Sequence, residues 1–221
     1  MKTVHLGDRV GWLWDAGLDL LLGASCHGCG VPGRSPCPQC IVAMLPHPEV
    51  VSQSLTVGVP VYAACQYDAP TSGFVIAYKD REAWQLTATL GELLLSALGR
   101  PPPDCVIVPV PSSPNAVRQR GFDHMGSLAR WVAKRSGVAS VGLLRYVRAV
   151  EHVGLSATQR KLLTRATMRA SPGRRRVVLV DDVTTTGASL AEARRALLAA
   201  GHEVCYAATI AHVLAPQTSR S

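Results

Sequence analysis

The chain has 221 residues, of which 48% are hydrophobic and only 5% aromatic, enough apolar material for a buried core of Val, Leu and Ala. The apolar stretch 10–25 contains Asp15 and Asp19 and lacks the charged start of a signal peptide, which argues against a membrane span or an exported chain. We therefore expect a cytoplasmic protein with no membrane span.

The net charge of +8 is unevenly distributed along the chain. Residues 115–176 hold 14 Lys or Arg against two acids, so this basic tract carries +12 and the rest of the chain −4. A tract of one sign indicates a phosphate-rich partner, either nucleic acid or a polyphosphorylated small molecule, unless it is simply a solvated face.

The first hundred residues predict a helix over about 8–22 and a Cys-rich loop over 26–40. The stretch 54–67 alternates apolar and polar residues as a half-buried strand does, and a helix is predicted over about 82–98. The run Arg100-Pro101-Pro102-Pro103 then stops the chain and marks a boundary.

Beyond this boundary, short apolar runs alternate with amphipathic segments. Strands are predicted at 105–108, 138–144, 177–180 and 203–211, and helices at 122–136 and 188–200. Apolar strands separated by helices indicate an α/β fold with a parallel sheet covered on both faces. In such sheets ligands bind beyond the carboxyl ends of the strands.

Four of the seven cysteines form the pattern Cys26-x2-Cys29-x7-Cys37-x2-Cys40. Two knuckles at this spacing can supply four thiolates that converge tetrahedrally on one Zn²⁺. Disulfides are the alternative, and a reducing cytoplasm disfavours them. We predict a structural zinc site in which His27 is a bystander. The other cysteines are expected to be ordinary buried thiols: Cys65, Cys105 and Cys205.

The apolar run 177–180 leads directly into Asp181 and Asp182, and then into a turn rich in hydroxyls and glycine that opens a helix. Such a turn can direct backbone N–H groups at a phosphate, with the helix dipole in support. Two carboxylates repel a phosphate but can accept hydrogen bonds from vicinal sugar hydroxyls. The pattern describes a ribose 5-phosphate pocket; the alternative is a solvated acidic strand end before an ordinary capped helix.

This stretch resembles the phosphoribosyl pyrophosphate signature of type I phosphoribosyltransferases. The resemblance implies that Asp181 and Asp182 hold the ribose hydroxyls and that the loop holds the 5-phosphate, with Mg²⁺ as a further candidate ion. The predicted binding residues that follow the acidic pair are Thr184, Thr185, Thr186, Gly187, Ala188 and Ser189. In purine-salvage members the position of Thr185 is an aspartate proposed as a base, so that group is missing here and no catalytic residue is assigned.

A third motif begins with Val108-Pro109-Val110-Pro111 and continues through Ser112 and Ser113 to Arg118 and Arg120. A strand end that leads into a Pro/Ser turn and then into arginines suits an anionic ligand such as pyrophosphate. Arg118 and Arg120 are the predicted pyrophosphate contacts.

Together, the knuckles, the Pro/Ser turn, Arg120-Gly121-Phe122 and the acidic signature resemble the ComF family, bacterial proteins linked to DNA uptake in competence that include the GntX-type members. The resemblance runs from about Cys26 to His212 in the family's order. Further segments that resemble the family are Tyr78-Lys79 and Gly154-Leu155-Ser156 with Arg160. The chain departs from the family near Leu163, where an asparagine is usual, and near Met168, where an aromatic is usual.

The resemblance implies a type I phosphoribosyltransferase-like parallel sheet flanked by helices, with a small N-terminal zinc module built on the four cysteines. The expected parts are an N-terminal helix and zinc-knuckle module (1–50), a hood-like β-rich segment with a linker helix (51–100) and the phosphoribosyltransferase-like domain (101–221).

The implied function is binding of phosphoribosyl pyrophosphate together with single-stranded DNA handling in uptake, beside a competence helicase. The basic tract fits single-strand binding, with 174–176 as candidate phosphate contacts and few aromatic residues for stacking: Phe122, Trp131 and Tyr146. The alternatives are an active phosphoribosyltransferase that acts on a nucleobase or other acceptor, and a sensor that binds the ligand without turnover.

Overall fold

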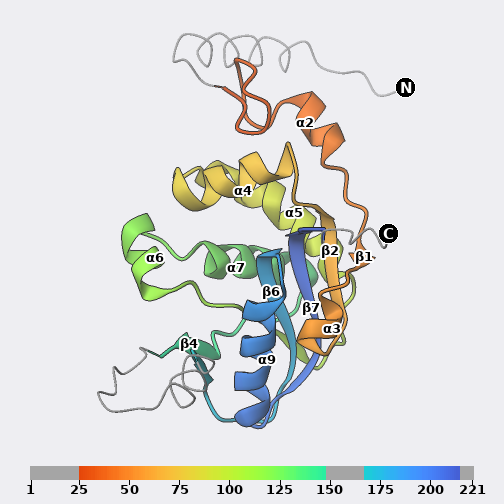
Figure 1. Cartoon of the computed structure of the whole chain (residues 1–221), viewed down its shortest axis with the longest axis vertical. Helices are drawn as coiled ribbons and strands as arrows, with labels where there is room; N and C mark the ends of the chain where they lie inside the picture. The colour runs from red at the N-terminus through yellow and green to blue at the C-terminus, as the bar shows by residue number, and fades with distance from the viewer. Residues whose placement is uncertain (1–24, 148–166, 215–221) are drawn as a thin grey trace, which may run out of the picture.

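A five-stranded sheet lies at the centre of the computed structural model, which describes residues 25–147 and 167–214 (Figure 1). The strand order is β1-β2-β7-β6-β3, and every neighbouring pair is parallel except β1 with β2. The strands are β1 (Glu49–Val50), β2 (Val61–Gln66), β3 (Cys105–Pro109), β6 (Arg176–Thr184) and β7 (Glu203–His212).

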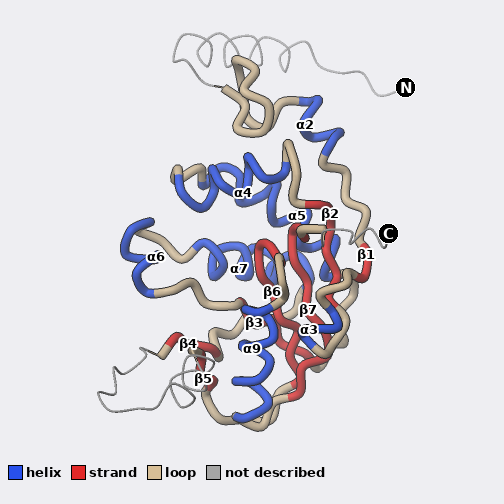
Figure 2. The backbone as a smooth tube through the Cα atoms, in the orientation of Figure 1, coloured by secondary structure: helices blue, strands red, loops and turns tan. Residues whose placement is uncertain are grey.

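The sheet is covered on both faces, because its central strands are apolar on both. In β6, Val178 and Val180 pack into one core, and Val177 and Leu179 pack into the other. The first core is closed by α4 (Thr71–Asp80), α5 (Thr87–Leu98) and α7 (His124–Ser136). The second is closed by α9 (Ala188–Ala199), α3 (Ser54–Val57) and a hairpin of β4 (Leu144–Tyr146) and β5 (Met168–Ala170), seen at the edge of the molecule in Figure 2.

The predicted α/β fold class is confirmed by this mainly parallel sheet and its flanking helices. Strands β3, β6 and β7 and helix α9 coincide with predicted elements, and β6 extends past its predicted end, through the acidic pair. Strand β2 adds to the same sheet beside β7, so segment 51–100 contributes directly to the central sheet. The division of the chain into three parts stays a prediction.

The prediction of a β-rich stretch over 54–67 is wrong in its first half. Ser54–Val57 is a short helix, α3, which ends at Gly58 with a φ of 78°. Leu55 is 90% exposed whereas Val57 is 2% exposed, although two residues of one strand face would be buried alike. The alternating pattern therefore came from a helical turn followed by β2.

The predicted strand at 138–144 is also corrected. Of this segment, only Ser140 forms a β-bridge to the central sheet, with Ile107 of β3. The Ile107 N–H donates to the Ala139 carbonyl, and the Ile107 carbonyl accepts from the Val141 N–H. The chain then leaves the sheet, and β4 pairs antiparallel with β5, which buries Leu144 in the second core. An edge contact thus replaces a full strand.

Two predicted helices begin later than the periodicity indicated. The segment 82–98 divides into a short 3-10 helix, η1 (Trp84–Leu86), and α5. The segment 122–136 begins as a helix only at His124, because the Asp123 side chain accepts from the Gly126 N–H and caps α7. Besides α3, three helices were not predicted: α4, α6 (Pro114–Arg120) and, in the Cys-rich loop, α2 (Pro38–Ala43).

The predicted helix at 8–22, the Gly154-Leu155-Ser156 segment and Arg160 lie outside the described residues. Within residues 25–147 and 167–214, none of the helices has the length and apolar character needed to cross a membrane.

Candidate functional site

The acidic pair lies at the carboxyl end of β6. Successive residues of a strand face opposite sides of the sheet. Asp182 therefore shares the face of Val178 and Val180, under α4 and α7, whereas Asp181 points to the side of α9. Two carboxylates that look equivalent in the sequence thus occupy different environments.

Asp182 is buried and contacts two basic side chains. Lys79 Nζ from the last turn of α4 lies 2.7 Å from Asp182 Oδ2, and His124 Nε2 from the start of α7 lies 2.6 Å from the same oxygen. The other oxygen accepts a hydrogen bond from the Val183 N–H. Burial alone would raise the pKa of Asp182, but the hydrogen bond with His124 and the charge of Lys79 outweigh it and hold that pKa below its usual value.

Asp181 has the opposite character. Its Oδ1 accepts the N–H of Asp182 over 2.9 Å. Burial and the adjacent charge of Asp182 raise the pKa of Asp181 well above its usual value. A pair of carboxyl groups with pKa values pushed in opposite directions is typical of functional sites.

A cavity of about 310 Å³ opens beside the acidic pair. Its charged and polar lining comes from four helices, two strands and the loop after β3: Lys79, Ser112, Ser113, Arg120, His124, Tyr146, Asp181, Asp182 and Ser189. A smaller hollow of about 50 Å³ lies in the loop that follows β6 and shares Asp181 and Ser189 with the cavity. The two hollows are therefore adjacent and meet at these residues.

The backbone of the loop after β6 is fixed by contacts with Gln53 and Val57. Gly187 adopts a φ of +78°, and a Cβ there would lie 3.1 Å from a Val57 methyl group, so glycine is required. The Gln53 side chain donates to the carbonyl of Thr185 over 2.8 Å and to that of Val213 over 2.9 Å. The smaller hollow is lined by all the predicted loop residues: Thr184, Thr185, Thr186, Gly187, Ala188 and Ser189.

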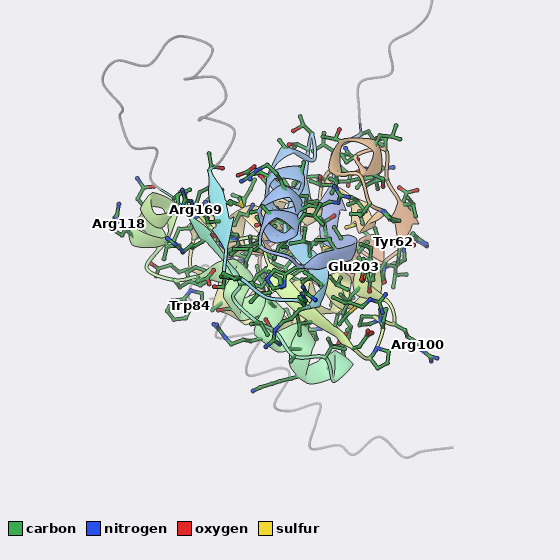
Figure 3. All side chains as sticks on the ribbon, turned by 90° about the horizontal axis from the view of Figure 1, so that it is seen from below. Tyr62, Trp84, Arg100, Arg118, Arg169 and Glu203 are labelled. Atoms are coloured by element: carbon green, nitrogen blue, oxygen red, sulfur yellow. The ribbon has the colours of Figure 1, made fainter. Side chains whose placement is uncertain are left out.

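The two predicted pyrophosphate contacts separate in the structure. Arg120 lines the cavity, and its Nε donates to Asp80 Oδ1 over 3.1 Å. Arg118 is exposed on α6 and is not among the cavity-lining residues, and Figure 3 shows it at the outer side of the molecule.

The four predicted metal ligands converge as expected. The Sγ atoms of Cys26, Cys29, Cys37 and Cys40 all lie within 4.8 Å of one another, with pairs at 3.7 Å and 3.6 Å. Tetrahedral Zn²⁺ with Zn–S bonds of about 2.3 Å needs sulfurs about 3.8 Å apart, so the donor set fits this ion. The ring of His27 instead lies 2.7 Å from Ser35 Oγ.

The chemistry of Cys26 also suits a metal ligand. Burial would raise the pKa of its thiol, but backbone N–H groups of Cys37, Cys29 and Gly28 outweigh burial and lower that pKa to about 6. A thiolate is the form that binds a metal. All seven cysteines lie in the described residues and are free thiols in this structure.

The basic tract is divided between two ends of the molecule. Figure 3 shows Arg118 and Arg169 on one side and Glu203 on the other. Arg176 Nε lies 3.5 Å from Glu203, and its Nη1 donates to both oxygens of Asp104, so Arg176 lies at the amino end of β6, away from the acidic pair, and its charge is matched locally.

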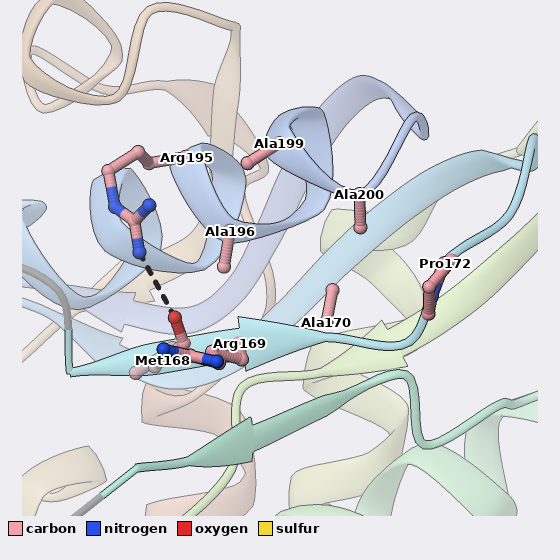
Figure 4. Close-up of a pocket in the computed structure, with 8 residues that line it drawn as sticks. All are labelled: Met168, Arg169, Ala170, Pro172, Arg195, Ala196, Ala199 and Ala200. Atoms are coloured by element: carbon pink, nitrogen blue, oxygen red, sulfur yellow. Dashed lines mark hydrogen bonds between the residues drawn. The ribbon is translucent and has the colours of Figure 1, made fainter.

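A further hollow of about 370 Å³ lies between β5 and α9 (Figure 4). Half of its lining residues are alanines, and its Arg195 donates to the Met168 carbonyl and pairs with Glu192. Arg169 is the second arginine at this hollow and is exposed, and neither residue of the acidic pair lines it.

Sequence reasoning assigned no role to three residues that build the site. Lys79 enters the sequence analysis only through the family resemblance, and His124 and Gln53 do not enter it. All three act through contacts far along the chain. A lysine in the last turn of a helix and a histidine at the start of another are common, so neither position carried a local signal.

The structure thus has a mainly parallel sheet with an acidic pair and a polar loop at the carboxyl end of its inner strand β6, together with an N-terminal four-cysteine cluster. This is the arrangement that the resemblance to type I phosphoribosyltransferases implied. The chain is 27% identical over 190 residues to the DNA utilization protein YhgH of Salmonella typhi, covering 80% of this chain and 78% of that protein. No family model matches the chain.

Several solved structures align with this chain. The glutamine phosphoribosylpyrophosphate amidotransferase of B. subtilis complexed with ADP and GMP is 23% identical over 55% of this chain, with a TM-score of 0.37. An adenine phosphoribosyltransferase is 17% identical over 61% of this chain and 74% of its own, also with a TM-score of 0.37. The chain spans about a quarter of the amidotransferase.

Proposed function

We propose that the chain binds 5-phosphoribosyl pyrophosphate across the two joined hollows at the carboxyl end of β6. The observation that supports this proposal is that the two hollows are lined by different kinds of group. One hollow is a loop of backbone amides and hydroxyls before a helix, and the other contains Lys79 and Arg120. Asp181 lines both, where a ribose would lie between its two phosphate groups.

In this assignment the loop from Thr185 to Ser189 holds the 5-phosphate, and Arg120 and Lys79 face the pyrophosphate. Asp181 accepts from the ribose hydroxyls. Asp182 contributes less directly, because its Oδ2 is already in contact with Lys79 and His124. Mg²⁺ would accompany the pyrophosphate, and Arg118 lies further out on the same helix as Arg120.

Titration calorimetry with phosphoribosyl pyrophosphate and Mg²⁺ tests this assignment. Asp181→Asn should weaken binding by at least about tenfold, because a hydrogen bond to a charged group contributes about 1.5–3 kcal/mol. Asp104→Asn is the matched control, since Asp104 lies at the opposite end of the sheet beside Arg176. Equal affinity of the wild type and Asp181→Asn would show that the sugar does not lie at Asp181, and no binding to the wild type would overturn the proposed function.

We also propose that Zn²⁺ occupies the four-cysteine cluster. The spacing of the four sulfurs supports a tetrahedral ion. Its role is structural, because all four positions of the tetrahedron are taken by protein sulfurs.

Single-stranded DNA binding is the second proposed function. One observation favours it besides the name of the Salmonella relative: Arg145 and Arg169 lie directly opposite each other in the β4–β5 hairpin, and both are exposed. Like charges opposite each other destabilise a hairpin, and neither arginine forms an ion pair with a described residue. A polyanionic partner would relieve that repulsion. The ComF-like resemblance leads us to propose a cytoplasmic location and a competence helicase as partner.

Anisotropy of labelled oligothymidylate over a salt series tests the DNA proposal. Joint replacement of Arg145 and Arg169 by Ser should flatten the dependence of log affinity on log salt by about 1.4, which is two phosphates at about 0.7 each. Arg176→Ser, which removes an arginine of the basic tract whose charge is matched by Asp104 and Glu203, should change it by less than about 0.7. If the wild type fails to bind even at low salt, DNA binding is not a direct activity of this chain.

A further inference from the structure

Three side chains form a hydrogen-bonded series that reaches from the buried carboxylate to the wall of the cavity. Asp182 Oδ2 lies 2.6 Å from His124 Nε2, and His124 Nδ1 lies 3.1 Å from Ser112 Oγ. His124 and Asp182 are 4% and 6% exposed, whereas Ser112 is half-buried and lines the cavity.

The series selects one tautomer of the neutral imidazole. An ionised carboxylate can only accept a hydrogen bond, so Asp182 holds the ring proton on Nε2. Nδ1 is then the acceptor, and the Ser112 hydroxyl donates to it. A hydroxyl, an imidazole and a buried carboxylate in this order can pass a proton inward from the cavity, because each group is within hydrogen-bond distance of the next.

We propose that Ser112, His124 and Asp182 form a proton relay that deprotonates the acceptor of the phosphoribosyl group. The inference rests on the proposed binding of phosphoribosyl pyrophosphate in the same cavity. The relay would also supply the base that the sequence lacks, because Thr185 occupies the position where salvage enzymes have an aspartate proposed as a base.

The proton transfer accompanies the exchange of bonds at C1 of the ribose. The acceptor, water or a nitrogen or oxygen nucleophile, forms a bond to C1 of the ribose, and the bond from C1 to the pyrophosphate oxygen breaks with its electron pair on pyrophosphate. The acceptor's proton passes to Ser112 Oγ while the Ser112 proton passes to His124 Nδ1. The imidazolium so formed is stabilised by Asp182 and later returns its proton to solvent.

Other charged groups face the relay. Lys79 lies 2.7 Å from the Asp182 oxygen that also contacts His124, and Arg120, Asp181 and Tyr146 line the same cavity. Lys79 keeps Asp182 ionised but opposes a positive charge on His124. A bound pyrophosphate in the cavity offsets Lys79 and Arg120, so the relay is best suited to accept a proton when the ligand is present.

The test uses the full chain with phosphoribosyl pyrophosphate, Mg²⁺ and water as the acceptor, and measures ligand affinity and pyrophosphate release separately. His124→Gln should bind the ligand within about threefold of the wild type but release pyrophosphate about 100-fold more slowly, in the range of general acid–base catalysis. Ser112→Ala, a change at the cavity wall that spares the core, should slow release about tenfold.

His202→Gln is the matched control, because His202 is equally buried at 4% and hydrogen-bonded to Ser171 at the other end of the sheet. It should release pyrophosphate at the wild-type rate. The relay is overturned if Ser112→Ala and His124→Gln release at that rate, or if the wild type binds the ligand yet releases nothing above the protein-free rate. Absence of binding would instead overturn the proposed function, and the relay with it.

Discussion

Replacement of Cys40 by serine is expected to release the metal and to loosen the whole N-terminal end of the described chain. A structural zinc site contributes on the order of 10 kcal/mol to folding of its module, and a thiolate lost from a closed tetrahedron is not replaced by a hydroxyl. Wild-type protein should carry about one Zn²⁺ per chain by elemental analysis, and Cys40→Ser should carry almost none.

The loss should extend beyond the cluster because the knuckle packs directly on α4. Cys26, Cys37 and Cys40 belong to the same core as Phe74 and Tyr78. A Cβ on Gly28 would collide with Phe74, and a Cβ on Gly73 would collide with the His27 carbonyl, so the two segments are in close contact. α4 carries Lys79 into the cavity, and removal of the metal should therefore also weaken ligand binding.

Cys65→Ser is the appropriate control, since Cys65 lies on β2 outside the cluster and its thiol donates to the Ile210 carbonyl. This variant should retain zinc, a cooperative melting transition and ligand affinity. A wild-type protein purified without chelator that contains no zinc would contradict the site.

The parts of the fold that the sequence predicts are those set by local chemistry. The run 177–180 is apolar on both faces, which only a central strand of a covered sheet requires. The four-cysteine cluster follows from spacing alone, because each knuckle is a tight turn and the two knuckles lie only seven residues apart. Both features survive in the structure with their predicted residues.

The parts that the sequence misses depend on contacts between distant segments. Gln53 reaches the loop carbonyl of Thr185, 132 residues away, and no local pattern marks such a contact. The helix at Ser54–Val57 is too short for periodicity to distinguish it from a strand. The difference between Asp181 and Asp182 requires knowing which helices cover each face of β6, and this is decided by topology.

The different environments of Asp181 and Asp182 predict different effects of replacing each one. Asp182→Asn should lower the free energy of unfolding by about 3 kcal/mol at pH 7, the scale for breaking a buried ion pair by removing one partner. The loss arises because Lys79 and His124 are left beside a neutral amide. For a chain of this length the melting temperature should fall by about 6–12 °C. Asp181→Asn should unfold at the wild-type temperature or above, because it removes a like charge from beside Asp182.

The pH dependence separates the two variants further. The pKa of Asp182 is lowered on folding, so its contribution to stability is present above the unfolded value of about 3.9 and is lost as the pH falls through the folded pKa. The gap between wild type and Asp182→Asn should therefore be full at pH 7 and close below about pH 4. The pKa of Asp181 is raised, so its ionisation costs stability as the pH rises from about 4. Thermal melts of both variants at several pH values measure these trends, and equal melting temperatures for the two variants at pH 7 would show that Lys79 and His124 do not depend on Asp182.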